Sequence, residues 1–222
     1  MSYYQNNKER VKLKAKIWNK AHPDKVNAKA NRKNERIRSL VVEAYGSQCA
    51  CCSESEKKFL SIDHIDGTGA EQRKITGSGS GFYRWLWQNK FPKDNYRLLC
   101  HNCNHAIGMF GICPHQGIID GPEKLKGLSL RGKRRARKLR LKIVSVYGGK
   151  CVCCGEDEPY FLTIDHINGG GKVHRIKTGR GNRFYKWLEH NNFPTDGFQL
   201  MCMNCNKAKG THNICPHSGV KI

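Results

Sequence analysis

Two short stretches of the chain alternate apolar and polar residues and contain the same Asp-His pair near their ends. They are FLSIDHI at residues 59–65 and FLTIDHI at residues 161–167. Alternation and a high content of Phe, Ile and Thr predict a β-strand in each. Further along, the apolar runs YRLLC at 96–100 and FQLMC at 198–202 each predict another short strand. The pattern thus predicts two pairs of short strands.

The segments between the paired strands each combine a glycine-rich loop with a helix. The first contains GTGAEQRKITGSGSG at residues 67–81, which predicts a loop. FYRWLWQNKF at 82–91 and FYKWLEHNNF at 184–193 have apolar residues at helical spacing. Because small domains need large apolar anchors, we expect these helices to supply core residues: Phe82, Tyr83, Trp85, Leu86, Phe184, Tyr185, Trp187 and Leu188. A further helix is expected to open at each of the motifs CHNCN and CMNCN.

The chain is an internal tandem repeat. Cys49 returns as Cys151, an offset of 102 positions (151 − 49), and His64 returns as His166 at the same offset. The register holds without a gap to the closing Cys-Pro-His, and about half of the paired positions are identical. We therefore treat the chain as two copies of one unit.

A basic segment precedes each copy and predicts a helix, because it lacks internal Gly and Pro and ends at Gly. Arg32 in the first segment aligns with Arg134 in the second, and Arg38 aligns with Arg140. These cations face either solvent alone or nucleic acid, and the sequence leaves both interpretations open. Residues 1 to about 30 form a further basic extension, either an arm that embraces DNA or a disordered tail, and within it Pro23 predicts the start of a helix.

The expected fold class is α+β, with two small zinc-stabilised modules in tandem and basic helical extensions. The predicted bounds are a basic helical extension at 1–40, a first module at 41–118, a basic linker and helix at 119–142, and a second module at 143–222. Within the third segment, residues 121–132 contain the breakers expected of a linker.

The charge of the chain restricts the classes of partner that it is expected to bind. Lys and Arg total 40 against 18 Asp and Glu, a formal net charge of +22. An enzyme for small neutral substrates has no need of this excess, whereas such a field attracts a polyanion such as nucleic acid. A generic basic protein, for example a ribosomal or packaging protein, remains an alternative on charge alone.

The cysteines predict structural zinc. The chain has twelve Cys, its first residues lack the apolar core of a signal peptide, and no apolar run is long enough to span a membrane. Two C-x-x-C pairs per copy can place four thiolates around one Zn²⁺ ion. We expect a reducing, cytoplasmic location and two structural zinc ions, held by Cys49, Cys52, Cys100 and Cys103 and by Cys151, Cys154, Cys202 and Cys205.

In each copy, three further residues of metal-binding types lie outside these C-x-x-C pairs. They are Cys51, Cys113 and His115, with Cys153, Cys215 and His217 in the second copy. One interpretation is a second metal site with a fourth ligand still to be found. The favoured interpretation is a packed thiol with a capping His, because three ligands do not close a structural site.

The Asp-His pairs and an Asn after the last Cys carry the candidate chemistry. Asp63 with Asn104, and Asp165 with Asn206, offer carboxylate and amide oxygens suited to Mg²⁺. A neutral His is the natural base for activating water near neutral pH, which points to His64 and His166. Phosphodiester hydrolysis needs both functions. Arg73 and Arg175, at matched places in the glycine-rich loops, are expected near the scissile phosphate, and an ordinary surface position is the open alternative.

The run from the first Cys pair to Asp-His and then N-x-x-L-C-x-x-C-N resembles the HNH, or ββα-metal, nucleases. Within them it is most similar to the phage recombination endonuclease VII group. The resemblance covers residues 45–108 and 147–210. It implies a ββα fold around zinc, catalytic His64 and His166, and Mg²⁺ ligation by the Asp and Asn residues. It also implies that Asn95 holds the His-bearing loop.

The two copies depart from this family pattern in different ways. The second has Gly197 where the first has Asn95, and the first has Ile107 where the second has the family's usual Lys, Lys209. From the missing Asn we expect the second site to be the slower one.

The expected function is DNA hydrolysis by two HNH sites in one chain, a monomer acting as a pseudo-dimer on double-stranded or branched DNA. The alternative is a non-catalytic, zinc-scaffolded protein that binds nucleic acid or belongs to a ribonucleoprotein.

Overall fold

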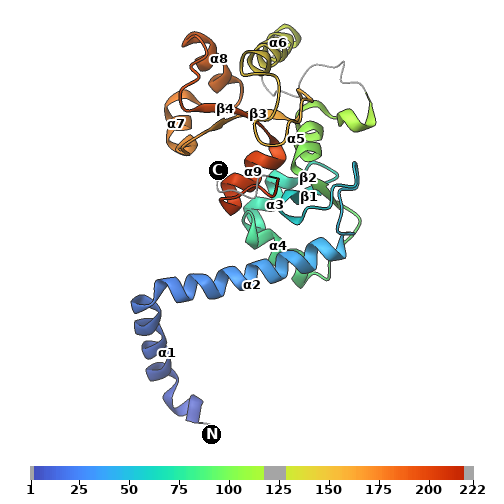
Figure 1. Ribbon diagram of the computed structural model, residues 1–222. Helices are drawn as coiled ribbons and strands as arrows, with labels where there is room; N and C mark the ends of the chain where they lie inside the picture. Colours follow the sequence, from blue (N-terminus) through green and yellow to red (C-terminus); the bar gives the residue numbers. More distant parts are fainter. Residues whose placement is uncertain (1–2, 118–128, 218–222) are drawn as a thin grey trace. The chain divides into compact units, whose positions relative to one another are not determined.

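The computed structural model describes residues 3–117 and 129–217 (Figure 1). The chain divides into two compact units. The first comprises residues up to 44 together with 70–92, and the second comprises residues 45–69 and those from 93 onward. Helices and two small antiparallel sheets make up the described residues, so the α+β class is confirmed.

The first unit is helical. Its helices are α1 (Tyr3–Ala21), α2 (Pro23–Ala44), most of α3 (Gly69–Thr76) and α4 (Ser80–Gln88). The predicted helix start at Pro23 is confirmed, with Asp24 in the first turn near the positive end of the helix dipole. Helices α2 and α4 pack against each other. Their buried residues are Ile37, Val41, Val42, Phe82 and Leu86.

The second unit holds both sheets. Strand β1 (Leu60–His64) pairs with β2 (Tyr96–Cys100), and β3 (Leu162–His166) pairs with β4 (Phe198–Cys202). Both pairs are antiparallel in the same register, because Leu60 faces Cys100 as Leu162 faces Cys202. Each later strand runs directly into a helix, α5 (His101–Phe110) or α9 (Met203–His212). The predicted strands and the helices after them are thus confirmed.

Further helical elements lie before and between these strands in the sequence. They are the short 3-10 helices η1 (Lys57–Phe59) and η2 (Pro114–Gln116) and the α-helices α6 (Leu130–Val146), α7 (Gly171–Thr178) and α8 (Asn182–His190). Helix α6 packs against α8. Together with β3, these helices bury Leu139, Ile143, Leu162, Ile164, Phe184 and Leu188 in one core.

The two copies exchange aromatic residues within the second unit. Phe59, which precedes β1 in the first copy, is buried in the core of the second copy. Phe161, its counterpart before β3, has its ring centroid 5.1 Å from that of His115 in the first copy. The ring of Phe59 lies 4.9 Å from that of His217 in the same way. Each copy therefore completes part of the other's packing.

A pair of hydrogen bonds joins α5 and α9 at their first turns. The main-chain N–H of Asn102 donates to Oδ1 of Asn204 at 3.0 Å, and the N–H of Asn204 donates to Oδ1 of Asn102 at 2.9 Å. Both residues are 5% exposed. The first turn of a helix leaves N–H groups without a partner inside the helix, so each Asn caps the helix of the other copy.

Three predictions from the sequence need correction. The glycine-rich loop at 67–81 contains helix α3, because residues 70–76 carry helix-forming side chains without Gly or Pro. In the predicted linker, residues 130–132 are already helical behind a Ser129 cap, while 118–128 lie outside the described residues. Arg140 is 3% exposed and so does not face solvent.

Across the part of the chain that the structure describes, the helices are too short or too polar to cross a lipid bilayer.

Substituting Asn102 tests the exchanged caps. Asn102→Ala removes the acceptor of the buried Asn204 N–H, so we expect the free energy of unfolding to fall by about 1–3 kcal/mol. Urea denaturation of the zinc-loaded protein measures it. Lys207→Ala, an exposed change on α9, serves as the control, with an expected effect within about 0.5 kcal/mol. An Asn102→Ala protein as stable as the control would show that the reciprocal bonds do not stabilise the pairing.

Candidate metal and catalytic centres

The first predicted zinc site is assembled in the structure. The sulfur atoms of Cys49, Cys52, Cys100 and Cys103 all lie within 4.8 Å of one another. Cys52 Sγ is 3.8 Å from Cys100 Sγ and 3.6 Å from Cys103 Sγ. Four sulfur ligands at about 2.3 Å from a tetrahedral zinc ion would be about 3.8 Å apart. The cluster could therefore hold a zinc ion without rearrangement.

The local backbone explains why these four residues meet. Cys100 is both the last residue of β2 and the N-cap of α5, and its sulfur accepts the N–H of Cys103 at 3.4 Å. At the other end, Cys49 Sγ accepts the N–H of Cys51 at 3.4 Å. Main-chain N–H groups directed at sulfur stabilise the thiolate form that binds metal.

The second copy repeats the cluster with Cys151, Cys154, Cys202 and Cys205. Cys154 Sγ lies 3.8 Å from Cys202 Sγ, and the N–H of Cys205 reaches Cys202 Sγ at 3.4 Å. Hydrogen bonds from neighbouring thiols, first from Cys202, lower the pKa of Cys151 well below its ordinary range. Bonds from Cys100 and then Cys103 do the same for the pKa of Cys49. In each cluster one thiol is thus favoured as a thiolate, and the pKa values of the other three thiols are raised.

The remaining thiols also lie in clusters. Cys51, Cys113 and His115 gather around Cys103, and Cys153, Cys215 and His217 gather around Cys205. The favoured expectation of a packed thiol with a capping His assumed that a fourth ligand was missing. The structure supplies that ligand from the first cluster, so four Cys/His clusters that could hold zinc exist among the described residues.

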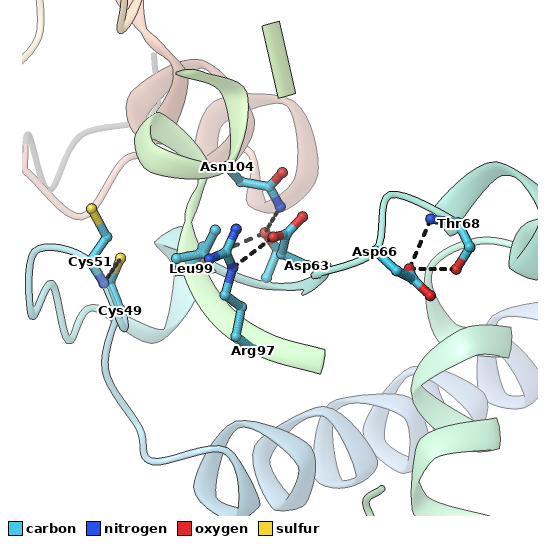
Figure 2. Close-up of polar contacts among 9 residues, drawn as sticks. Cys49, Cys51, Asp63, Asp66, Thr68, Arg97, Leu99 and Asn104 are labelled. Atoms are coloured by element: carbon cyan, nitrogen blue, oxygen red, sulfur yellow. Dashed lines mark hydrogen bonds and ion pairs between the residues drawn. The ribbon is translucent and has the colours of Figure 1, made fainter. Parts of the chain in front are cut away.

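The first candidate catalytic site lies at the end of β1 (Figure 2). Asp63 Oδ2 accepts a hydrogen bond from Arg97 Nε at 2.9 Å, and Arg97 is the residue opposite Asp63 in the strand pairing. Asn104 Nδ2 donates to Ser61 Oγ at 3.2 Å. Since Ser61 and Asp63 share one face of β1, the Asn104 amide and the Asp63 carboxylate lie on the same side of the sheet. The predicted pairing of Asp63 with Asn104 is consistent with this geometry.

His64 follows Asp63 and closes the strand. Its ring contacts the edge of Tyr96 at a centroid distance of 5.1 Å. The N–H of Ile65 donates to the main-chain carbonyl of Asn95 at 3.0 Å. The Asn95 side chain is exposed. The hydrogen bond that fixes the backbone after His64 uses the main-chain carbonyl of residue 95, which any amino acid at this position could supply.

Gly197 makes the same contact in the second copy. Its carbonyl accepts the N–H of Ile167 at 3.0 Å, and Gly197 has φ +81°, a conformation that favours glycine. The backbone N–H after the His is therefore bonded to the equivalent carbonyl in both copies. This hydrogen bond does not distinguish the two copies, and the slower second site stays a prediction.

The second Asp-His pair is held by two side chains. Asp165 Oδ2 accepts from Gln199 Nε2 at 2.8 Å and from Lys209 Nζ at 2.6 Å. Lys209 also reaches the main-chain carbonyl oxygens of His166 at 3.3 Å and Ile167 at 3.0 Å. Lys209 is 10% exposed, so this cation fixes the turn from inside the structure.

His166 lies in an aromatic setting. Its Nε2 is 2.9 Å from Nδ1 of His174, and its ring stacks on Phe184 at 5.6 Å. Burial, and then the nearby His174, lower the pKa of His166. A lowered pKa keeps the imidazole neutral, which is the form that accepts a proton.

A cavity of about 240 Å³ opens beside His166. Arg175 lines it, as do the buried Arg140 and two residues of the first copy's α5, His105 and Met109. Arg140 Nη2 lies 3.3 Å from His105 Nε2 and donates to the carbonyl of Leu162 at 2.6 Å. The structure thus brings Arg175, which was expected near the scissile phosphate, to the same cavity as His166, and adds Arg140 and His105 to it.

The remaining predicted residues are located by the helices that carry them. Asn206 lies half-buried on α9 at the position equivalent to Asn104. Arg73 lies on α3 in the first unit. Sequence reasoning missed Arg97, Gln199 and His174. The first two were accessible from strand register, since antiparallel pairing of the predicted strands sets each of them opposite an Asp.

The chain matches no protein-family model, and comparison with curated proteins and with solved structures likewise found no match.

Removing metal should unfold the second unit. If zinc holds the clusters, an excess of a strong chelator should abolish the cooperative thermal transition, because metal-binding free energy is part of the folding free energy of such sites. Circular dichroism during heating measures this. Readdition of Zn²⁺, but not Mg²⁺, should restore the transition. A melting curve unchanged after the chelator has removed all bound metal would contradict a structural role.

Proposed function

We propose that the protein is a metal-dependent endonuclease and that each copy is a ββα-metal module. One observation carries the proposal. In both copies an Asp-His pair ends a strand that pairs antiparallel with the strand leading to the last Cys pair, and an Asn follows the last Cys on the next helix. A zinc-binding scaffold alone has no need of this trio, and hydrolysis of a phosphodiester does.

The oxygen atoms of the first copy fit a hard divalent cation. Asn104 turns its amide nitrogen to Ser61, which leaves its oxygen as the group for a metal. The Arg97 contact engages Oδ2 of Asp63, and we assign Oδ1 to the ion. Bound there, Mg²⁺ would stabilise negative charge on the phosphate. In the second copy Asp165 and Asn206 would have this role.

The chain's own residues would prepare the nucleophile. His64 and His166 each act as a base toward water. The main-chain N–H of the residue after each His donates to the carbonyl of residue 95 or 197, and this hydrogen bond fixes the backbone that carries the imidazole ring. In the second copy, Arg175 and Arg140 line the cavity beside His166 and would bind the phosphate. His174 is placed to share a proton with His166, from which it is 2.9 Å away.

A basic surface supports a nucleic acid as substrate. A groove of about 490 Å³ between α6 and α8 is lined by Arg135, Lys138, Lys142 and Lys186. All four are exposed, and Lys142 is paired with Glu189 at 3.3 Å. Cations along one groove attract a phosphate backbone and release its counterions. DNA, double-stranded or branched, is the proposed substrate, and one chain with two sites is the proposed active form.

One observation favours the second candidate, a non-catalytic nucleic-acid-binding protein. Each Asp that would hold Mg²⁺ is already paired with a cation, Asp63 with Arg97 and Asp165 with Lys209. These ion pairs neutralise the carboxylates and would suit a scaffold that has lost its metal. Cleavage assays decide between the two functions.

Replacing both His residues should abolish cleavage. We expect the protein to nick supercoiled plasmid in the presence of Mg²⁺, and His64→Ala/His166→Ala to lower the rate at least about 100-fold, the loss typical of a missing general base. Agarose gels follow the time course, and gel shifts check that DNA binding persists. His190→Ala, an exposed His on α8, is the control. A double variant as active as the wild type would remove both residues from the chemistry. A zinc-loaded wild type that binds DNA but never nicks it would favour the second candidate.

Lys209 should act as a positioning residue for the second site. In a His64→Ala background, Lys209→Ile copies the residue of the first copy and frees the Asp-His turn. We expect the nicking rate to fall about tenfold, because small misplacements of catalytic groups are costly. Lys209→Arg should recover most of the rate.

The dependence on Mg²⁺ separates the two possible effects of Lys209. A lower Mg²⁺ requirement and a faster rate in Lys209→Ile would show that Lys209 competes with the metal and does not position the turn.

A further inference from the structure

We infer that each copy binds a second zinc ion, which shares one thiolate with the first. In the first copy this ion is held by Cys51, Cys103, Cys113 and His115, and Cys103 bridges the two metals. In the second copy the ligands are Cys153, Cys205, Cys215 and His217, with Cys205 as the bridge. The chain would then carry four zinc ions in two binuclear centres.

The distances in the second cluster fit a tetrahedral ion. His115 Nδ1 lies 3.4 Å from Cys103 Sγ and 3.3 Å from Cys113 Sγ. In the second copy, His217 Nδ1 lies 3.2 Å from Cys205 Sγ and 3.8 Å from Cys215 Sγ. Ligands at about 2.1 Å (N) and 2.3 Å (S) from one zinc would be about 3.6 Å apart. Three Cys and one His form a common structural zinc set.

The number of ligands matches two metals. Each copy gathers six Cys and one His into two overlapping clusters of four. Two tetrahedral ions need eight ligand positions, and seven ligands fill them when one is shared. All twelve cysteines of the chain lie in these clusters, so no thiol is left over. A single zinc per copy would instead leave Cys113 and Cys215 as fully buried thiols.

The backbone after α5 is shaped to return to the metal. Gly111 ends the helix with φ +91°, and the chain turns back through η2, which carries His115. In the second copy Asn213 ends α9 with φ +58°, and Asn is the residue that best replaces Gly in this conformation. Two different residues thus produce the same turn, and each turn brings a Cys and a His beside the bridging Cys.

The bridging position also has a physical reason. Cys103 is fully buried in the first turn of α5, where the N–H groups and the helix dipole favour negative charge. A thiolate there can be shared by two cations, and its own N–H is already directed at Cys100 Sγ. Cys205 has the same place on α9.

Metal content of the wild-type protein tests the inference without any variant. Full-length protein saturated with Zn²⁺ and then desalted should contain four zinc ions per chain by elemental analysis. Two per chain would overturn the proposal. Protein loaded with ¹¹³Cd should give four resonances, coupled in two pairs through the shared sulfur. Four resonances without coupling would overturn the bridge.

Variants then assign the second site. Cys113→Ser and His115→Ala should each lower the metal content from four to three, and Cys113→Ser/Cys215→Ser from four to two. His190→Ala, the exposed control, should keep four. Unchanged content in the double variant would contradict the assignment. These readouts do not depend on cleavage, so an inactive protein with four zinc ions would refute the proposed nuclease and leave this inference standing.

Discussion

The gathering of cysteines into clusters that could hold zinc is the constraint on which the second unit depends. Each sheet has only two strands of five residues, and a pair of strands this short does not fold by itself in water. The Cys49 loop, the end of β2 and the start of α5 meet at one cluster of sulfur atoms. An ion there fixes the strand end and the helix start relative to each other. Asn104 lies on α5, and Asp63 lies on β1, the strand that pairs with β2, so the scaffold ion would also set the geometry of the candidate catalytic site.

The reciprocal hydrogen bonds of Asn102 and Asn204 join the two copies next to the Cys clusters. Each Asn is the residue just before Cys103 or Cys205, the Cys that its copy's two clusters share, so the contact between copies begins one residue from the clusters. Phe59 and Phe161 reinforce it by packing near the other copy's closing His. A disturbance of the Cys clusters in one copy should therefore reach the other copy. Duplication has here produced an interface that is symmetric in its contacts.

Much of this could be predicted from the sequence, and what could not has physical reasons. Strand alternation and Cys spacing identify β1–β4 and the first zinc ligands, because both depend on local patterns. The short helix α3 was missed because the glycines around it dominate the pattern. The fourth ligand of the second cluster could not be found by spacing, because Cys103 already had a role in the first. Buried Arg140 looked like any other cation of a basic helix until the fold placed it beside Leu162 and His105.

The two candidate sites differ in how their Asp is held, and this difference follows from single residues. Arg97, opposite Asp63, satisfies the carboxylate from the neighbouring strand, and the first copy then has no need of a Lys on α5, where it carries Ile107. Gln199 is neutral and cannot balance Asp165, and there Lys209 supplies the charge from α9. One cation per Asp is thus kept in both copies by different routes. A half-buried carboxylate needs a counter-charge whether or not a metal arrives, since desolvation penalises an unpaired ion. The ion pairs are therefore compatible with a carboxylate that binds a metal ion and keeps a counter-charge when the ion is absent.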